Sequence, residues 1–160
     1  MLMYGEFVED RDSFHKALSA YDASLEVWTR ESSPLEWSLN QMGRGNALRN
    51  LGRLDKDVAA LREAAACYEL ALEEQSTDID PVMWAKTQIN RANVYALIGD
   101  LADDTAAGRQ AELTYDAAGR ALRATGADDL FQMVGSRSVD LLLHRHAWSE
   151  ALSELSLIHI

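Results

Sequence analysis

The chain has 160 residues, 48% of them hydrophobic, with only two prolines and nine glycines, which is enough for one domain and typical of stacked helices. Its 26 acidic residues outnumber 15 lysines and arginines, and the net charge of −11 disfavours nucleic acid and anionic membrane surfaces as partners. The single cysteine, Cys67, excludes an intramolecular disulfide and a four-cysteine zinc site, and its place in an apolar helical pattern predicts a buried side chain. The sequence shows neither a signal peptide nor a membrane-length apolar run, so we expect a cytoplasmic protein.

The first element in chain order is an incomplete two-helix unit, residues 1–33. Met1 to Glu6 match Leu48 to Arg53 as the end of a first helix with a turn at Gly5, and a second helix is predicted near 9–30. We therefore expect the chain to open inside a repeat, as a piece of a longer polypeptide.

The second unit, residues 34–80, begins with Ser33-Pro34-Leu35-Glu36, the pattern of a serine cap, a first-turn proline and a capping-box glutamate. The pattern predicts a first helix near 34–51, ended by Gly52 in the left-handed conformation. A second helix is predicted near 55–76, with Asp55 as its cap.

The third unit, residues 81–127, begins with the same helix-start pattern, a capping residue followed by proline, in Asp80-Pro81. Its helices are predicted near 81–98, ended by Gly99, and near 101–124, capped by Asp100. A partial unit follows at 128–154, with helices near 128–145 and from about residue 147. The last residues, 155–160, read LSLIHI and are predicted to be a non-native or disordered tail.

A period of 47 residues relates these units without a gap. Identical residues recur at this spacing along both helices of the two complete units: Pro34/Pro81, Trp37/Trp84, Gln41/Gln88, Arg44/Arg91, Asn46/Asn93, Gly52/Gly99, Leu54/Leu101, Asp57/Asp104, Ala59/Ala106, Ala60/Ala107, Arg62/Arg109, Ala64/Ala111, Tyr68/Tyr115 and Ala71/Ala118.

These residues resemble the tetratricopeptide repeat, in a long-unit variant similar to bacterial arrays that accompany ATPase or caspase-like signalling domains. Gly45-Asn46-Ala47-Leu48 with Gly52 matches the order of that family's first helix, and Ala64, Tyr68 and Ala71 match the small–aromatic–small spacing of its second. The family's unit is about 34 residues long, and its usual leucine is Arg44 or Arg91 here. The resemblance implies an all-α, right-handed α-solenoid of antiparallel helix hairpins with about seven helices. HEAT-type repeats are the structural alternative, because their units have about this length.

The resemblance also implies a concave groove that binds a partner, lined by one stripe of the first helices. The groove residues carried over from the family are Met42, Asn46, Arg49, Asn50, Lys86, Ile89, Asn90, Asn93, Arg137 and Asp140. The column Asn46, Asn93, Asp140 is the centre of this prediction, because an amide can both donate to and accept from a peptide backbone. The alternative is that these amides only bond between neighbouring helices.

Other patterns receive structural interpretations. Some family members grip a terminal carboxylate with two lysines, but Met42 and Met133 stand at those positions here. Paired acids such as Glu73-Glu74 are read as capping or solvated residues, and His144 and His146 lie on different helix faces, so no metal site is expected. Trp37 and Trp84 are read as packed against the preceding hairpin, with Trp28 and Phe131 in the same role, rather than as exposed anchors.

The sequence contains no phosphate loop, nucleophile elbow or zinc-protease motif, so we expect no enzyme and no cofactor. The expected function is a protein-interaction scaffold that binds a peptide or helix of a partner. The alternative is a structural spacer or self-association segment of a larger bacterial signalling protein, whose ends stack on one another.

Overall fold

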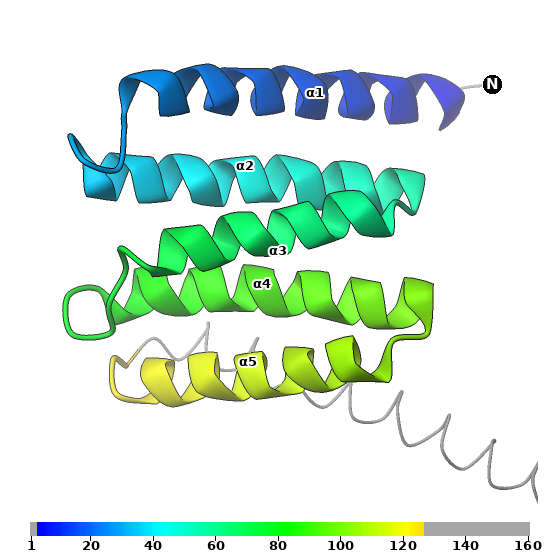
Figure 1. Cartoon of the computed structure of the whole chain (residues 1–160). Helices are drawn as coiled ribbons and strands as arrows, with labels where there is room; N and C mark the ends of the chain where they lie inside the picture. The colour runs from blue at the N-terminus through cyan, green and yellow to red at the C-terminus, as the bar shows by residue number, and fades with distance from the viewer. Residues whose placement is uncertain (1–2, 127–160) are drawn as a thin grey trace, which may run out of the picture.

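A computed structural model describes residues 3–126, and these form five α-helices joined by short connections (Figure 1). The helices are α1 (Met3–Val27), α2 (Pro34–Asp55), α3 (Val58–Leu72), α4 (Pro81–Ala102) and α5 (Thr105–Arg123). The described part of the chain contains no strand, so the predicted all-α class is confirmed.

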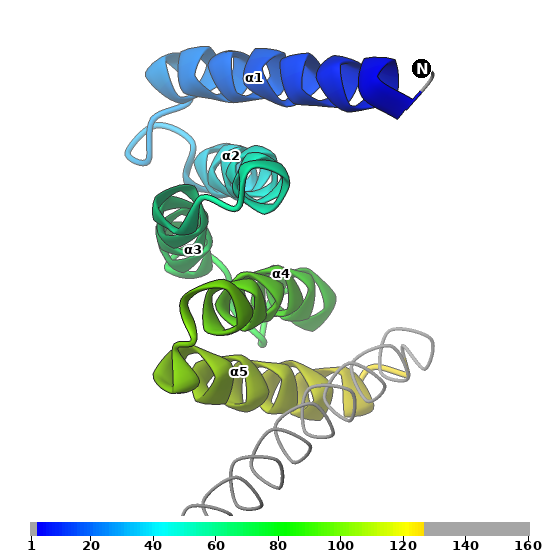
Figure 2. The same cartoon turned by 90° about the vertical axis from the view of Figure 1, so that its right-hand side faces the viewer.

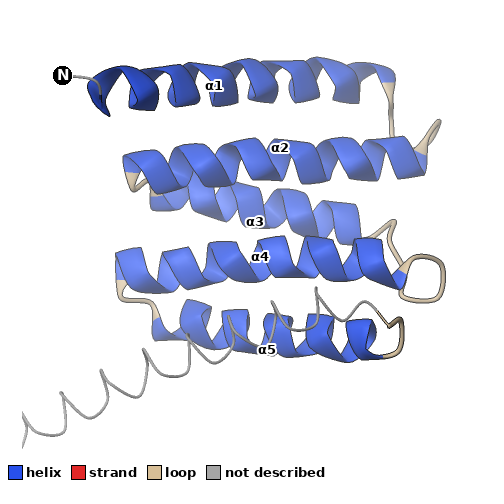
Figure 3. Cartoon of the chain, turned by 180° about the vertical axis from the view of Figure 1, so that it is seen from behind, coloured by secondary structure: helices blue, strands red, loops and turns tan. Residues whose placement is uncertain are grey.

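The helices stack in chain order, each running back along its predecessor (Figure 1). Viewed nearly end-on, α3 lies to one side of α2 and α4, so the middle of the stack has two layers (Figure 2). The connections at 28–33 and 73–80 lie at one end of the stack, and the tight turns at 56–57 and 103–104 lie at the other (Figure 3).

The 47-residue period appears in the helix boundaries themselves. α4 begins and ends 47 residues after α2, and α5 begins 47 residues after α3. The predicted starts at Pro34 and Pro81 are therefore confirmed. The predicted second helices are longer than the observed ones, since α3 ends at Leu72 and α5 at Arg123.

The predicted helix ends at Gly52 and Gly99 are wrong. α2 continues to Asp55 and α4 to Ala102, and the left-handed residues that end them are Lys56 (φ 53°) and Asp103 (φ 51°). The backbone N–H of each left-handed residue donates to the carbonyl of Gly52 or Gly99, one turn back.

The two glycines serve packing instead. A Cβ on Gly52 would lie 2.8 Å from Leu61 Cγ, and a Cβ on Gly99 would lie 3.1 Å from the backbone nitrogen of Gly108. In both hairpins the missing side chain lets the second helix approach the first closely just after the turn.

The caps of the second helices are Asp57 and Asp104, not the predicted Asp55 and Asp100. The Asp57 carboxylate accepts from the N–H groups of Ala59 and Ala60, at 2.9 and 3.2 Å, and Asp104 bonds the equivalent pair in α5. Of the first-helix caps, Asp80 accepts from Met83 N at 2.8 Å, whereas the Ser33 side chain makes no capping bond.

The first helix also differs from expectation. α1 runs without interruption from Met3 to Val27, so Gly5 marks no turn and no separate helix end precedes it. The predicted helices near 128–145 and 147, the partial unit 128–154 and the tail 155–160 lie outside the described residues.

Two apolar clusters hold the stack together. One joins α2, α3 and α4 around Leu61, Tyr68 and Ile98, and the other joins α4 and α5 around Ile89, Tyr115 and Leu122. Alanine is the most frequent residue in both clusters, and several alanines have no exposed surface, which lets the helix axes approach. Cys67 is 2% exposed, which confirms the prediction that it is buried.

Candidate functional site on helices α2 and α4

Two predicted groove residues from successive repeats are in direct contact where α2 lies against α4. Arg49 Nη1 on α2 donates to Asn90 Oδ1 on α4 at 3.0 Å, and Thr87 Oγ1 donates to Met42 Sδ at 3.3 Å. Met42, Asn46 and Arg49 on α2 have the spacing i, i+4 and i+7, as do Lys86, Asn90 and Asn93 on α4, so each set lies along one side of its helix. We call these six residues, together with Asn50, the amide face. The structure therefore brings together residues that the sequence places in separate repeats.

The two repeated asparagines are fixed by the same contact in each hairpin. The hydroxyl of Tyr68 donates to Asn46 Oδ1 at 2.7 Å, and that of Tyr115 donates to Asn93 Oδ1 at 2.6 Å. Each bond links the first helix of a hairpin to its own second helix. The packing role that the sequence left open for these amides is therefore present, and it fixes the oxygen of each side chain on the tyrosine hydroxyl.

Burial raises the pKa of the Tyr68 hydroxyl above its ordinary value, so this group is neutral and a donor at physiological pH. The tyrosine ring has no exposed surface, so its hydroxyl holds Asn46 from a rigid position. An amide held in this way loses little rotamer freedom when it binds a ligand.

Ile89 does not belong to the amide face. Its side chain is 4% exposed and packs in the cluster between α4 and α5 with Ala92 and Tyr115. The prediction that Ile89 contacts a partner is therefore wrong, because this position of α4 faces its own second helix. Arg137 and Asp140 lie outside the described residues.

The amide face carries positive charge on a protein whose net charge is −11. The bond of Arg49 is to a neutral amide, and Lys86 is exposed and forms no ion pair with any described side chain. Asn50 bonds back to the Asn46 carbonyl at 3.0 Å. The face thus combines amide groups with two cations whose charge is not compensated by a neighbouring carboxylate among the described residues.

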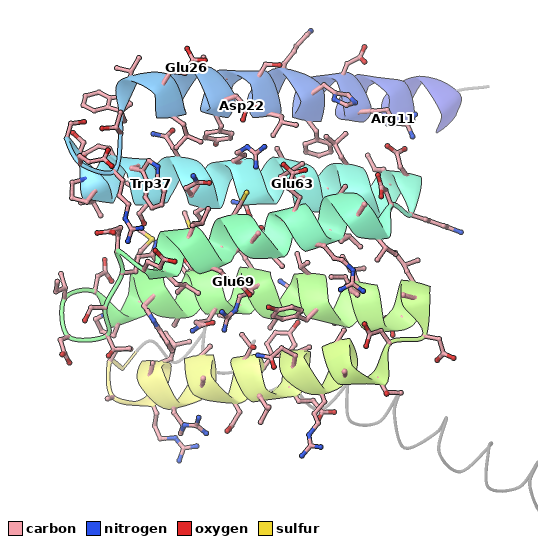
Figure 4. The ribbon with its side chains drawn as sticks, in the orientation of Figure 1. Arg11, Asp22, Glu26, Trp37, Glu63 and Glu69 are labelled. Atoms are coloured by element: carbon pink, nitrogen blue, oxygen red, sulfur yellow. The ribbon has the colours of Figure 1, made fainter. Side chains whose placement is uncertain are left out.

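Arg44, two residues before Asn46 on α2, makes structural contacts and does not belong to the amide face. Its guanidinium bonds Asp22 on α1 and Glu63 on α3, each at 2.7 Å, and its Nη1 lies 3.1 Å from Cys67 Sγ (Figure 4). One arginine therefore ties three helices together. Burial raises the pKa of the Cys67 thiol, although Arg44 opposes this, so the thiol stays neutral and is a poor nucleophile at neutral pH.

The predicted packing of the tryptophans on the preceding hairpin is not confirmed. Trp37 and Trp84 are half-buried, but the cluster that Trp84 packs against lies in its own hairpin, between α4 and α5. Trp28 is 45% exposed, so its predicted core role is wrong. Phe131 lies outside the described residues, as do Met133, His144 and His146.

The paired acids have structural partners. Glu73 and Glu74 both pair with Arg30, and Asp104 caps α5. Within residues 3–126 no group of three potential ligands could hold a metal ion, and none of these helices is long and apolar enough to cross a membrane.

Comparison with known proteins adds no relative. No protein-family model matches the chain, and no match is found among curated proteins or solved structures. The functional assignment therefore depends on the repeat and on the chemistry of its surfaces.

Proposed function

We propose that this chain is a tetratricopeptide-like, right-handed α-solenoid that binds a peptide or helix of a partner protein on the amide face, without catalytic chemistry. The observation that carries the proposal is the Arg49–Asn90 bond, which joins two predicted contact residues from successive repeats at 3.0 Å. A continuous surface of this kind can follow an extended ligand from one repeat to the next.

The polar groups of the amide face fit a peptide. Side-chain amides satisfy backbone N–H and C=O groups, which an extended peptide presents in alternation. Arg49 and Lys86 favour a ligand that carries carboxylates, because a charge-assisted bond is stronger than a neutral one. The excess of acidic residues elsewhere on the protein disfavours binding of the same ligand at other sites.

The test is a selection followed by a matched mutation. A random peptide library on phage is selected on the immobilised full chain, and the affinity of enriched peptides is measured by fluorescence anisotropy. The double variant Arg49→Ala/Lys86→Ala is expected to weaken binding at least about tenfold, since each charged bond contributes about 1.5 kcal/mol.

The control removes the same charge elsewhere. Lys16 and Arg109 are exposed on α1 and α5 and form no ion pair with a described side chain, so Lys16→Ala/Arg109→Ala should change affinity by less than about twofold. Equal losses in the two double variants, or a library without enriched peptides, would overturn the proposal.

A second function, self-association of the ends, is favoured by one observation. Val27 and Trp28, where α1 ends, are 69% and 45% exposed. The equivalent positions of the next two units are covered: Gln75, 47 residues after Trp28, bonds Ser38 of α2, and Leu122, a further 47 residues on, packs against α4. Light scattering over a concentration series distinguishes the two functions. A monomer at every concentration supports the peptide scaffold alone, and a dimer that Val27→Ser/Trp28→Ser abolishes would support end-to-end stacking.

A further inference from the structure

The two repeated tryptophans are covered differently. Over Trp37, the guanidinium of Arg30 lies 5.2 Å from the ring centroid. Two carboxylates at the end of α3 hold it there, since Arg30 bonds Glu74 at 2.6 Å and Glu73 at 2.7 Å. Figure 4 shows Trp37 at the end of the stack where the α1–α2 connection turns back. The first site is thus closed by a cation from its own chain.

The equivalent site around Trp84 has neither the arginine nor the two glutamates that cover Trp37. At the positions 47 residues later, Arg30 is replaced by Thr77, Glu73 by Arg120 and Glu74 by Ala121. Threonine is too short to reach over the indole, and Arg120 pairs with Asp116 on its own helix. Among the described residues the space beside Trp84 is open: it is a surface cavity of about 540 Å³, lined by Thr77, Asp78, Pro81, Trp84, Arg120 and Ala121, among others.

The chemistry of this cavity indicates what it binds. The face of an indole attracts a cation, and Arg30 over Trp37 shows that a guanidinium fits this geometry in the same protein. Asp78 supplies a carboxylate to the lining, while the charge of Arg120 is compensated by Asp116. Pro81 and the alanines supply an apolar wall for a methylene stem.

We propose that the Trp84 cavity binds an arginine side chain of a partner protein, in the place that Arg30 occupies over Trp37. The site shares no residue with the amide face, so this proposal goes beyond the peptide-binding function and stands or falls separately from it. The field of a protein with a net charge of −11 also favours a cationic group.

The test uses the full chain, labelled with ¹⁵N, and N-acetyl-arginine methylamide as the probe. We expect saturable shifts of the Trp84 indole N–H signal, with the Trp37 indole unmoved because Arg30 already covers it. The neutral analogue N-acetyl-citrulline methylamide should bind about threefold more weakly, as expected for the loss of a partly exposed cation–π contact.

Two variants exchange the properties of the two sites. Thr77→Arg/Arg120→Glu/Ala121→Glu transplants the cover of Trp37 onto Trp84, and the Trp84 response to the probe should disappear. Arg30→Ala uncovers Trp37 beside Glu73 and Glu74, and a second responding indole should appear. Circular dichroism checks that each variant keeps the helical content of the wild type.

Three results would overturn the proposal: equal shifts with arginine and citrulline probes, equal responses of the two indoles in the wild type, or no Trp84 shift at saturating probe. The Arg30→Ala variant keeps the test decisive if the triple variant fails to fold, because a Trp37 that stays silent without Arg30 would show that an uncovered tryptophan in this geometry does not bind guanidinium.

Discussion

The hairpins α2–α3 and α4–α5 have the same helix starts and the same tyrosine–asparagine bond, yet they are packed differently beside their turns. In the first, the side chain of Leu61 fills the space against Gly52; in the second, the equivalent residue is Gly108, whose backbone lies directly against Gly99. The 47-residue period therefore fixes where the helices start and which side chains bond, while single substitutions within the period decide how closely the two helices of a hairpin approach.

The largest effect is expected at Leu61. This side chain is fully buried in the cluster that joins α2, α3 and α4, so Leu61→Ala should lower the free energy of unfolding by about 2–5 kcal/mol. Urea unfolding followed by circular dichroism measures the change. A loss below about 1 kcal/mol would show that the first hairpin does not depend on this contact.

The glycine pair of the second hairpin should respond in opposite directions. In Gly99→Ala the new Cβ meets the Gly108 backbone, which cannot move aside, so we expect a net destabilisation of about 1 kcal/mol despite the better helix propensity of alanine. In Gly108→Ala the Cβ meets nothing within 4 Å, and a stabilisation of about 0.5–1 kcal/mol should follow. The same sign in both variants, measured by urea unfolding, would contradict the close backbone contact.

The tyrosine–asparagine bond provides a matched pair across the hairpins. Tyr68→Phe and Tyr115→Phe each remove one hydroxyl donor, and each should cost about 1 kcal/mol, because the bonds have nearly the same length and burial. Thermal unfolding compares the two variants. A clear effect in only one hairpin would show that the repeated bond does not have a repeated role.

The smallest effect on stability is expected from the loss of the Asp104 cap at acidic pH. Backbone N–H groups of Ala107 and Ala106, with Arg62, hold the pKa of Asp104 below its ordinary value. Its contribution to stability is therefore present above the unfolded-state pKa of about 3.9 and is lost as pH falls through the lower folded-state value. Asp104→Asn should reduce the difference between the urea midpoints at about pH 5 and about pH 3. An unchanged difference would exclude this cap as a source of acid sensitivity.

The sequence predicted the helical class and the starts of α2 and α4, because proline and aspartate at a fixed period are local signals. It misassigned Gly52 and Gly99, since a glycine that ends a helix and a glycine that lets a second helix approach look alike in one sequence. The residues that do end these helices in the left-handed conformation, Lys56 and Asp103, are not glycines, so the glycine rule for helix ends did not identify them. Asp10 stands where Asp57 and Asp104 cap, yet α1 passes through it, because a continuing helix satisfies the same backbone donors.

The candidate site was predictable in outline only. The family pattern predicted one surface for Asn46, Asn90 and Asn93, and the Arg49–Asn90 bond is the contact that joins the two helices there. The same pattern included Ile89, because a shift of one helix position turns a side chain from the surface to the core. The covered and open tryptophans were missed. The sequence does carry a signal, because Arg30, Glu73 and Glu74 are replaced by Thr77, Arg120 and Ala121 one period later. This change can be interpreted only when the structure shows that the connection, the tryptophan and the end of the second helix surround one indole.

The most direct test of the binding function locates a selected peptide on the protein. The ¹⁵N-labelled full chain is titrated with the tightest peptide from the phage selection, and perturbed signals are assigned by NMR. We expect the side-chain amides of Asn46, Asn90 and Asn93 to shift together, with the backbone around Lys86. Shifts gathered instead on the second helices, around the exposed Leu70 of α3 and Leu113 of α5, or around Val27 and Trp28, would contradict the claim that α2 and α4 form the binding surface.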